Sequence, residues 1–114
     1  KVLFCSGKVY YDLLERQQTK DVKDIAIVRL EQLYPFPEKQ LYAIIKRYPN
    51  AGQWCWVQEE PENMGAWGFV LRTFTQTGNR LELVAREADS SPAVGLQQLH
   101  AVQQENLVHR AFNQ

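Results

Sequence analysis

Residues 2–28 read VLFC-SGK-VYYDLLERQQT-KDVKD-IAIV, and this stretch decides the fold. The run Val2–Cys5 is apolar without alternation, which is typical of a strand covered on both faces. The turn residues Ser6–Gly7 end that run, and Val9–Thr19 then carries apolar side chains at helical spacing. After a polar connector, Ile25–Val28 is a second buried-strand run. Buried strands joined through a helix predict a parallel sheet covered by helices.

The rest of the chain repeats this alternation of strand and helix. After the loop over residues 34–37, the apolar stripe from Leu41 to Tyr48 predicts a helix. The later elements are a strand over Trp54–Val57, a helix over Ala66–Phe74, an alternating edge strand over Leu81–Val84, and a helix opened by Ser90–Pro92. We therefore expect one α/β domain over residues 1–114, a three-layer α/β/α sandwich around a mainly parallel sheet.

Composition excludes several classes of protein. The chain has 114 residues, no formal net charge and 45% hydrophobic residues, unlike an intrinsically disordered chain. It lacks both the basic surplus of a nucleic-acid-binding protein and an apolar run of about 18 residues that spans a membrane. Two cysteines are too few for a disulfide scaffold. Because the chain opens on Lys1 with an apolar run and without a signal peptide, we expect a piece of a longer protein.

The carboxyl ends of parallel strands are where ligands bind in such sheets, and polar residues follow the predicted strands there. Ser6–Lys8 joins a strand to a helix, so it is either an ordinary turn or an anion site at the helix start. It matches neither a P-loop nor a dinucleotide fingerprint. Arg29 ends the second run and Arg86 follows the fourth. If Arg29 is partly buried, its guanidinium needs a carboxylate or a ligand phosphate.

The acidic pair Glu59–Glu60 follows the third strand run. Because adjacent strand residues point to opposite faces, at most one of them faces the crevice, and a general acid–base pair is not expected. A single glutamate paired with Arg29 or Lys8 is expected instead. The alternative partners of Arg29 are therefore Glu31, Glu59, Glu60 or a ligand.

The remaining chemistry-bearing residues predict no catalytic or metal site. Cys5 and Cys55 lie inside strand runs and are expected to be buried free thiols. His100 and His109 are nine residues apart on one helix, so they face opposite sides and do not form a metal pair. We expect the side chains of Trp54 and Trp56 to fill the core and that of Trp67 to pack at an interface.

Four stretches carry a more specific signal than any short motif. They are Cys5–Leu13 (CSGKVYYDL), Val28–Pro37 (VRLEQLYPFP), Trp56–Trp67 (WVQEEPENMGAW) and Ser91–Gly95 (SPAVG). In order and spacing they closely resemble the C-terminal domain of the bacterial thiamine-dependent 2-oxoglutarate dehydrogenase component, and the resemblance covers nearly the whole chain. The GKVYY and QEEP segments argue against the related domains of transketolase and pyruvate-type dehydrogenases.

The resemblance implies a transketolase-like fold, with the four strands in the order 2-1-3-4. It also implies a parent enzyme that decarboxylates 2-oxoglutarate on thiamine diphosphate with Mg²⁺. The parent then succinylates the lipoyl group of the succinyltransferase component, as a cytoplasmic bacterial homodimer of the tricarboxylic acid cycle. Two earlier domains make the thiamine site in that family. This domain alone is therefore expected to be catalytically inert and to bind neither thiamine diphosphate nor a metal, a nucleic acid or a membrane.

Two roles for the domain itself follow from the resemblance. In some relatives it lines a regulatory pocket for a nucleotide or acetyl-CoA. The residues assigned to that pocket are Ser6 and Lys8 for phosphate, Arg29 for a second charge, and Glu59 as an orienting or ribose contact. The alternative is a purely structural domain that braces the dimer, which an exposed apolar patch around Trp67 and the last helix would favour.

Overall fold

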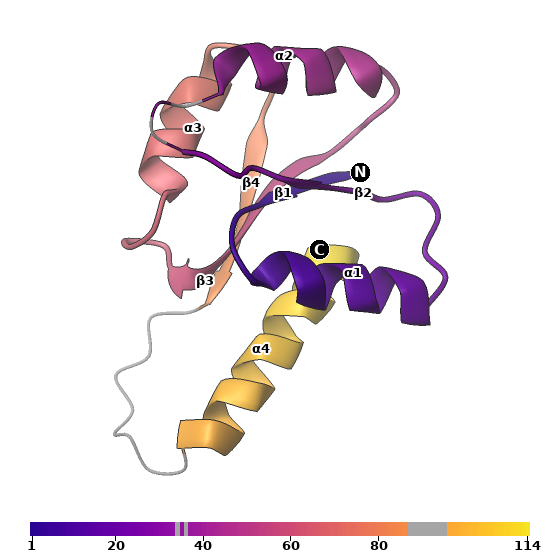
Figure 1. Ribbon diagram of the computed structural model, residues 1–114, viewed down its shortest axis with the longest axis vertical. Coiled ribbons are helices and arrows are strands. Elements are labelled where there is room, and N and C mark those ends of the chain that lie inside the picture. The colour runs from indigo at the N-terminus through magenta and orange to yellow at the C-terminus, as the bar shows by residue number, and fades with distance from the viewer. Residues whose placement is uncertain (34, 36, 87–95) are drawn as a thin grey trace.

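The sheet has four parallel strands in the order β2-β1-β3-β4 (Figure 1). A computed structural model describes residues 1–114 except 34, 36 and 87–95. The strands are β1 (Val2–Cys5), β2 (Ala26–Arg29), β3 (Trp54–Pro61) and β4 (Leu81–Arg86). Every residue of β1 is buried, because β1 has a neighbouring strand on each side and helices on both faces.

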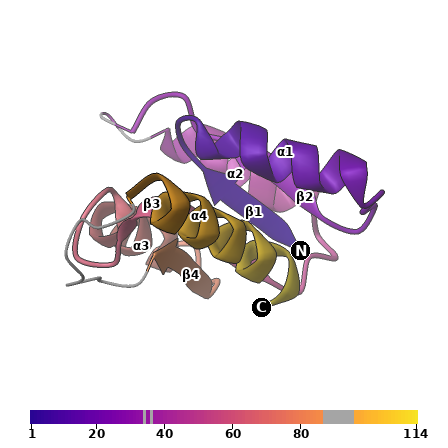
Figure 2. The same ribbon diagram turned by 90° about the horizontal axis from the view of Figure 1, so that it is seen from below.

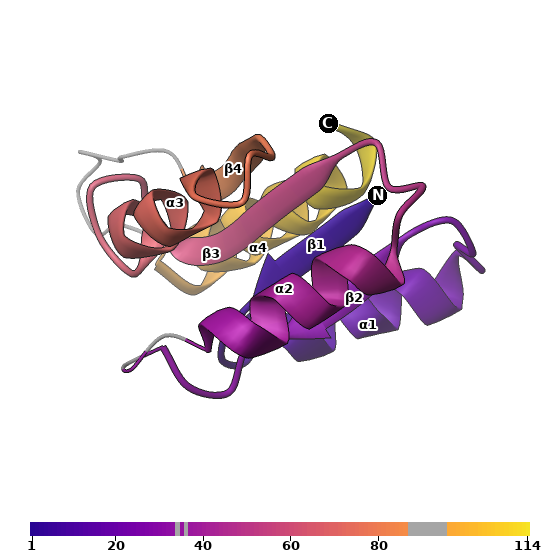
Figure 3. The same ribbon diagram turned by 90° about the horizontal axis from the view of Figure 1, so that it is seen from above.

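Four helices cover the two faces of the sheet. They are α1 (Val9–Thr19), α2 (Glu38–Arg47), α3 (Trp67–Thr75) and α4 (Leu96–Asn113). Figure 2 shows α1 and α4 on one face, and Figure 3 shows α2 and α3 on the other. Each face has its own apolar core. Leu3, Leu13 and Leu107 belong to the core beneath α1 and α4, whereas Phe4 and Phe74 belong to the core beneath α2 and α3.

The architecture and strand order expected from the sequence are confirmed. Several element bounds differ, among them those of α3, which lies one residue later than the expected Ala66–Phe74. β2 lies one residue later than expected, β3 continues beyond Val57 to Pro61, and β4 continues to Arg86. The expected helix start at Ser90–Pro92 lies outside the described residues. None of the described helices is long and apolar enough to cross a membrane.

The aromatic residues divide between core and surface. Trp54 and Trp56 are buried in the core, as expected. Trp67 is half-buried against the core beneath α2 and α3, whereas α4 covers the opposite face of the sheet. The sheet therefore separates Trp67 from α4, so the two do not share the apolar patch that would favour a purely dimer-bracing domain.

A buried glutamine explains the extension of β3. Gln58 is 3% exposed, and its Oε1 accepts a hydrogen bond of 2.9 Å from the Trp56 indole. Its Nε2 donates to the backbone carbonyls of Glu60, Pro61 and Met64 at 3.1, 2.9 and 2.9 Å. One satisfied side chain thus holds the backbone after the register shift between β3 and β4, which lies between Gln58 and Pro61.

Candidate functional site

A cavity of about 640 Å³ lies beside the carboxyl end of β3, between α1 and α4. Its lining residues come from three elements and from the turn before α1. They are Lys8, Tyr11, Asp12, Glu15, Arg16, Thr19, Glu59, His100, Ala101, Gln104, Glu105 and Val108. This is the sheet edge at which the sequence predicts a ligand crevice.

The side chain of Gln104 joins the groups at this cavity. Its Nε2 donates to Asp12 Oδ2 at 2.7 Å and to Glu59 Oε1 at 2.9 Å. Its Oε1 accepts a hydrogen bond from Arg86 Nη2, and Arg86 Nη1 lies 3.0 Å from His100 Nδ1. One neutral amide therefore connects α4 to α1, β3 and β4.

This network corrects the expected partner of Glu59. We expected Lys8 or Arg29, but the Glu59 carboxylate accepts from Gln104. The signal was present in the sequence: Gln104 precedes Val108 and Ala111 by four and seven residues, so it stands on the core-facing stripe of its helix. A polar residue at such a position needs a polar partner inside the fold.

The two adjacent glutamates do face different surroundings, as expected. Glu59 lines the cavity, whereas the exposed Glu60 lies against Gly65. Gly65 has a φ of +69°, and a Cβ built there would lie 2.8 Å from Glu60 Oε2. The positive φ of the loop after β3 therefore favours glycine at this position, where the exposed Glu60 side chain lies close by.

Lys8 reaches the cavity from the turn between β1 and α1. Gly7 has a φ of +77°, which lets the backbone turn sharply before the helix. Lys8 occupies the N-cap position without a side-chain capping bond, and its side chain is exposed. The described lining of the cavity contains four carboxylates and the two cations Lys8 and Arg16. Its charge balance is therefore acidic.

Arg29 has protein partners. Its Nη1 donates to the Tyr11 hydroxyl at 3.2 Å, and its guanidinium carbon lies 5.5 and 5.3 Å from the ring centroids of Tyr10 and Tyr11. Its Nε lies 3.7 Å from Glu31 Oε1. The hydrogen bond to Tyr11, aided by the Glu31 charge, raises the pKa of Arg29 above its ordinary value. Of the carboxylates considered from the sequence, Glu31 is the one that pairs with it.

The predicted pocket residues therefore divide into two pairs. Lys8 and Glu59 line the same cavity, whereas Ser6 and Arg29 are absent from its described lining. Their assignment to one phosphate-bearing ligand stays a prediction.

The cysteines are buried and free, as expected. Burial raises the pKa of the Cys5 thiol to about 12 and that of the Cys55 thiol to about 11. Both are therefore protonated, weak nucleophiles at neutral pH. His100 lies beside Arg86 and His109 beside Asn113. Within the described ranges, no three His, Cys, Asp or Glu side chains gather in a way that could hold a metal ion.

A comparison with protein families shows to which family the chain belongs. The family model described as "2-oxoglutarate dehydrogenase C-terminal" matches residues 1–112. The chain belongs to the 2-oxoglutarate dehydrogenase C-terminal family. The resemblance expected from the four sequence stretches is therefore confirmed.

Several relatives of this 2-oxoglutarate dehydrogenase C-terminal domain are named 2-oxoglutarate dehydrogenase E1 component. The protein from Cupriavidus necator is 46% identical over 98% of this chain and 12% of its own length. The proteins from Haemophilus influenzae and Rickettsia felis are 43% and 44% identical, over 99% and 98% of this chain and 12% of their lengths. The chain thus spans about an eighth of the length of these relatives.

A solved structure shares the fold. It is titled "Split gene transketolase, inactive beta4 tetramer", and it matches with a TM-score of 0.64 and 17% identity, over 98% of this chain and 38% of that one. The expected transketolase-like architecture is confirmed.

Proposed function

We propose that this chain is the C-terminal domain of a thiamine-dependent 2-oxoglutarate dehydrogenase. The observation that supports this is the family match over residues 1–112, on a sheet of the expected strand order. The parent enzyme decarboxylates 2-oxoglutarate and transfers the succinyl group to the lipoyl group of a succinyltransferase component. It acts as a homodimer in the bacterial cytoplasm.

Mg²⁺, and the thiamine diphosphate bound with it, do not fit the described residues of this chain. The described residues provide no cluster of carboxylate, imidazole or thiolate ligands for a metal ion. We therefore assign the cofactor to the remainder of the parent enzyme, and no step of the reaction to this domain.

Decarboxylation assays on two preparations test this proposal. The full-length parent is expected to decarboxylate 2-oxoglutarate when thiamine diphosphate and Mg²⁺ are supplied, and residues 1–114 alone are expected to be inactive. Activity of the isolated domain, or a full-length enzyme that acts on another 2-oxo acid and leaves 2-oxoglutarate unchanged, would contradict it.

A regulatory role is a second candidate. The supporting observation is that the exposed Lys8 ammonium and the Glu59 carboxylate line one cavity at the predicted ligand edge. A nucleotide or acetyl-CoA would place a phosphate near Lys8, with further contacts from Ser6, Arg29 and residues of neighbouring domains. The test is titration of the full-length enzyme with acetyl-CoA or AMP, alongside Lys8→Ala and Arg29→Ala. If the affinity for acetyl-CoA and AMP is unchanged in both variants, the regulatory role is refuted and the purely structural, dimer-bracing role is favoured.

A further inference from the structure

The outer edge of β4 has no neighbouring strand in the part of the chain that the structure describes. There β4 pairs with β3 alone, so it ends the sheet on that side, as the sequence predicts. The N–H and C=O groups of an edge strand are able to pair with a strand of another chain, and native proteins block this with charged side chains or a covering helix. What covers the outward groups of β4 therefore decides whether it joins another strand.

The register of the sheet shows which backbone groups point to this edge. The Val2 N–H donates to the Gln53 carbonyl at 2.9 Å, so every second residue of β3, counted from 53, bonds to β1. Trp56 belongs to the other set, which bonds to β4, and it stands opposite Leu83. In a parallel ladder the residue opposite directs its own groups away. The N–H and C=O groups of Leu83, and of Ala85 two residues later, therefore point to the outer edge.

Two side chains at the end of α4 bind these outward carbonyls. Arg110 Nη2 donates to the Ala85 carbonyl, and Gln114 Nε2 donates to the Leu83 carbonyl at 3.3 Å. Arg110 Nε also donates to Asn106 Oδ1 at 2.8 Å, one turn earlier on α4, and this bond orients the guanidinium toward β4. Both carbonyls therefore already have a donor.

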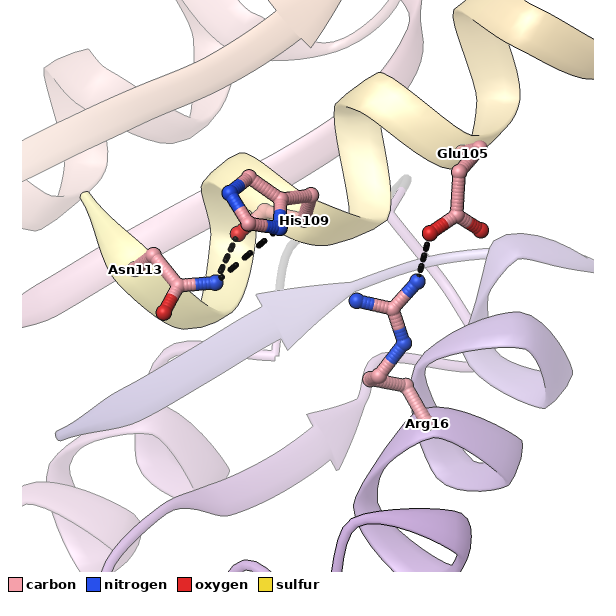
Figure 4. A network of polar contacts seen from close by, with 4 residues as sticks. All are labelled: Arg16, Glu105, His109 and Asn113. Atoms are coloured by element: carbon pink, nitrogen blue, oxygen red, sulfur yellow. Dashed lines mark hydrogen bonds and ion pairs between the residues drawn. The ribbon is translucent and has the colours of Figure 1, made fainter.

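The orientation of α4 on the sheet explains why its side chains reach this edge. One flank of the helix faces α1, where Glu105 forms an ion pair with Arg16 (Figure 4). The residues that follow this flank by one position lie about 100° further round the helix, on the side of β4. They are Asn106, Arg110 and Gln114. The contact of α4 with α1 on one flank thus leaves the other flank to cover the outer edge of β4.

We propose that Arg110 and Gln114 block the outer edge of β4, so that β4 of a second copy of this chain does not pair with it. Each of the two side chains occupies a carbonyl that an added strand needs as a hydrogen-bond acceptor. The contact is autoinhibitory, because the chain covers with its own helix an edge that is otherwise able to self-associate.

A second copy is the partner because β4 is able to pair with itself in antiparallel fashion about Leu83. In that register Ala85 lies opposite Leu81 of the second copy, and the half-buried Leu83 becomes covered. The ends of β4 carry like charges, since Arg80 lies opposite Arg86 of the second copy. Like charges directly opposite each other are destabilising, so they oppose self-pairing together with the two side chains of α4.

Sedimentation velocity of the purified full-length parent protein tests the proposal, in about 0.5 M NaCl to screen the charges at the ends of β4. In the double variant Arg110→Ala, Gln114→Ala, the fraction of species larger than the wild-type assembly should rise about fivefold. Arg72→Ala removes an exposed arginine from α3 and is the matched control, which should sediment like the wild type. A double variant that sediments like this control overturns the proposal. The assay does not depend on decarboxylation, so its result is separate from that of the proposed function.

Leu83→Pro distinguishes pairing at the edge from aggregation of unfolded protein. Because the Leu83 N–H points outward, proline there keeps the hydrogen bonds to β3 and removes a donor that an added strand needs. Added to the double variant, it should return the large species to the wild-type level. If the large species persist or increase, they come from unfolded protein and the proposal is overturned. If the double variant fails to fold, Gln114→Ala alone, at an exposed position, replaces it, and the same two outcomes decide.

Discussion

Replacement of Gln58 by leucine is the sharpest test of how this fold is held at the carboxyl end of β3. Gln58 is 3% exposed and uses both ends of its amide. The oxygen accepts from the Trp56 indole at 2.9 Å, and the nitrogen donates to three carbonyls within 3.1 Å. Leucine has a similar volume, so the substitution removes hydrogen bonds without opening a large cavity.

The magnitude follows from the burial of each partner. Trp56 is 2% exposed, so its indole N–H would lose its acceptor in a site that water does not reach. An unsatisfied buried donor costs about 1–3 kcal/mol, and the lost bonds to the loop carbonyls add about 1 kcal/mol. We therefore expect the free energy of unfolding to fall by about 3 kcal/mol.

Urea unfolding of the 114-residue chain, followed by tryptophan fluorescence, measures this change. With a denaturant slope of about 1.5–2 kcal/mol/M, the midpoint should fall by about 1.5–2 M. Gln40→Leu, at an exposed position of α2, is the matched control and should unfold near the wild-type midpoint. A Gln58→Leu midpoint that coincides with the control would refute the reasoning.

Three further perturbations have expected outcomes. Gly65→Ala should lower the free energy of unfolding by about 1–2 kcal/mol in the same assay, because of its positive φ and the close carboxylate, whereas Gly52→Ala should be neutral. Gln104→Leu should destabilise by about 1–3 kcal/mol and speed amide hydrogen exchange in α4, and unchanged exchange would contradict the network. Cys5 and Cys55 should react with a thiol reagent at pH 8 only after unfolding.

The raised thiol pKa values also set a pH dependence. In the unfolded chain the pKa of both thiols lies near the ordinary cysteine value of 9.0, whereas in the fold the Cys5 and Cys55 thiols stay protonated until about pH 12 and 11. The unfolded state therefore loses protons first, and the two thiols lower stability as pH rises from about 9 to 11, by about 1.4 kcal/mol per pH unit each. A Cys5→Ala, Cys55→Ala variant should lose less stability over that range, and identical pH profiles would refute this.

The sequence by itself determined the fold class, and its resemblance to a known family supplied the strand order. Apolar runs without alternation, such as Val2–Cys5, indicated strands covered on both faces, and the helices between them required parallel connections. It also predicted that the cysteines and two tryptophans lie in the core. Because successive side chains of a strand point to opposite faces, it predicted that Glu59 and Glu60 have different surroundings. These results follow from local periodicity, which the chain carries in neighbouring residues.

Only the tertiary structure decided which polar groups meet. Glu59 and Gln104 are 45 residues apart, and Arg16 and Glu105 are 89 residues apart. Periodicity can assign each side chain to a face, but it does not specify which residue of a distant helix lies opposite. That choice depends on how α4 crosses the sheet, which the apolar contacts of Leu107, Val108 and Ala111 set together. The packing of that one helix therefore created both the amide network and the cavity between α1 and α4.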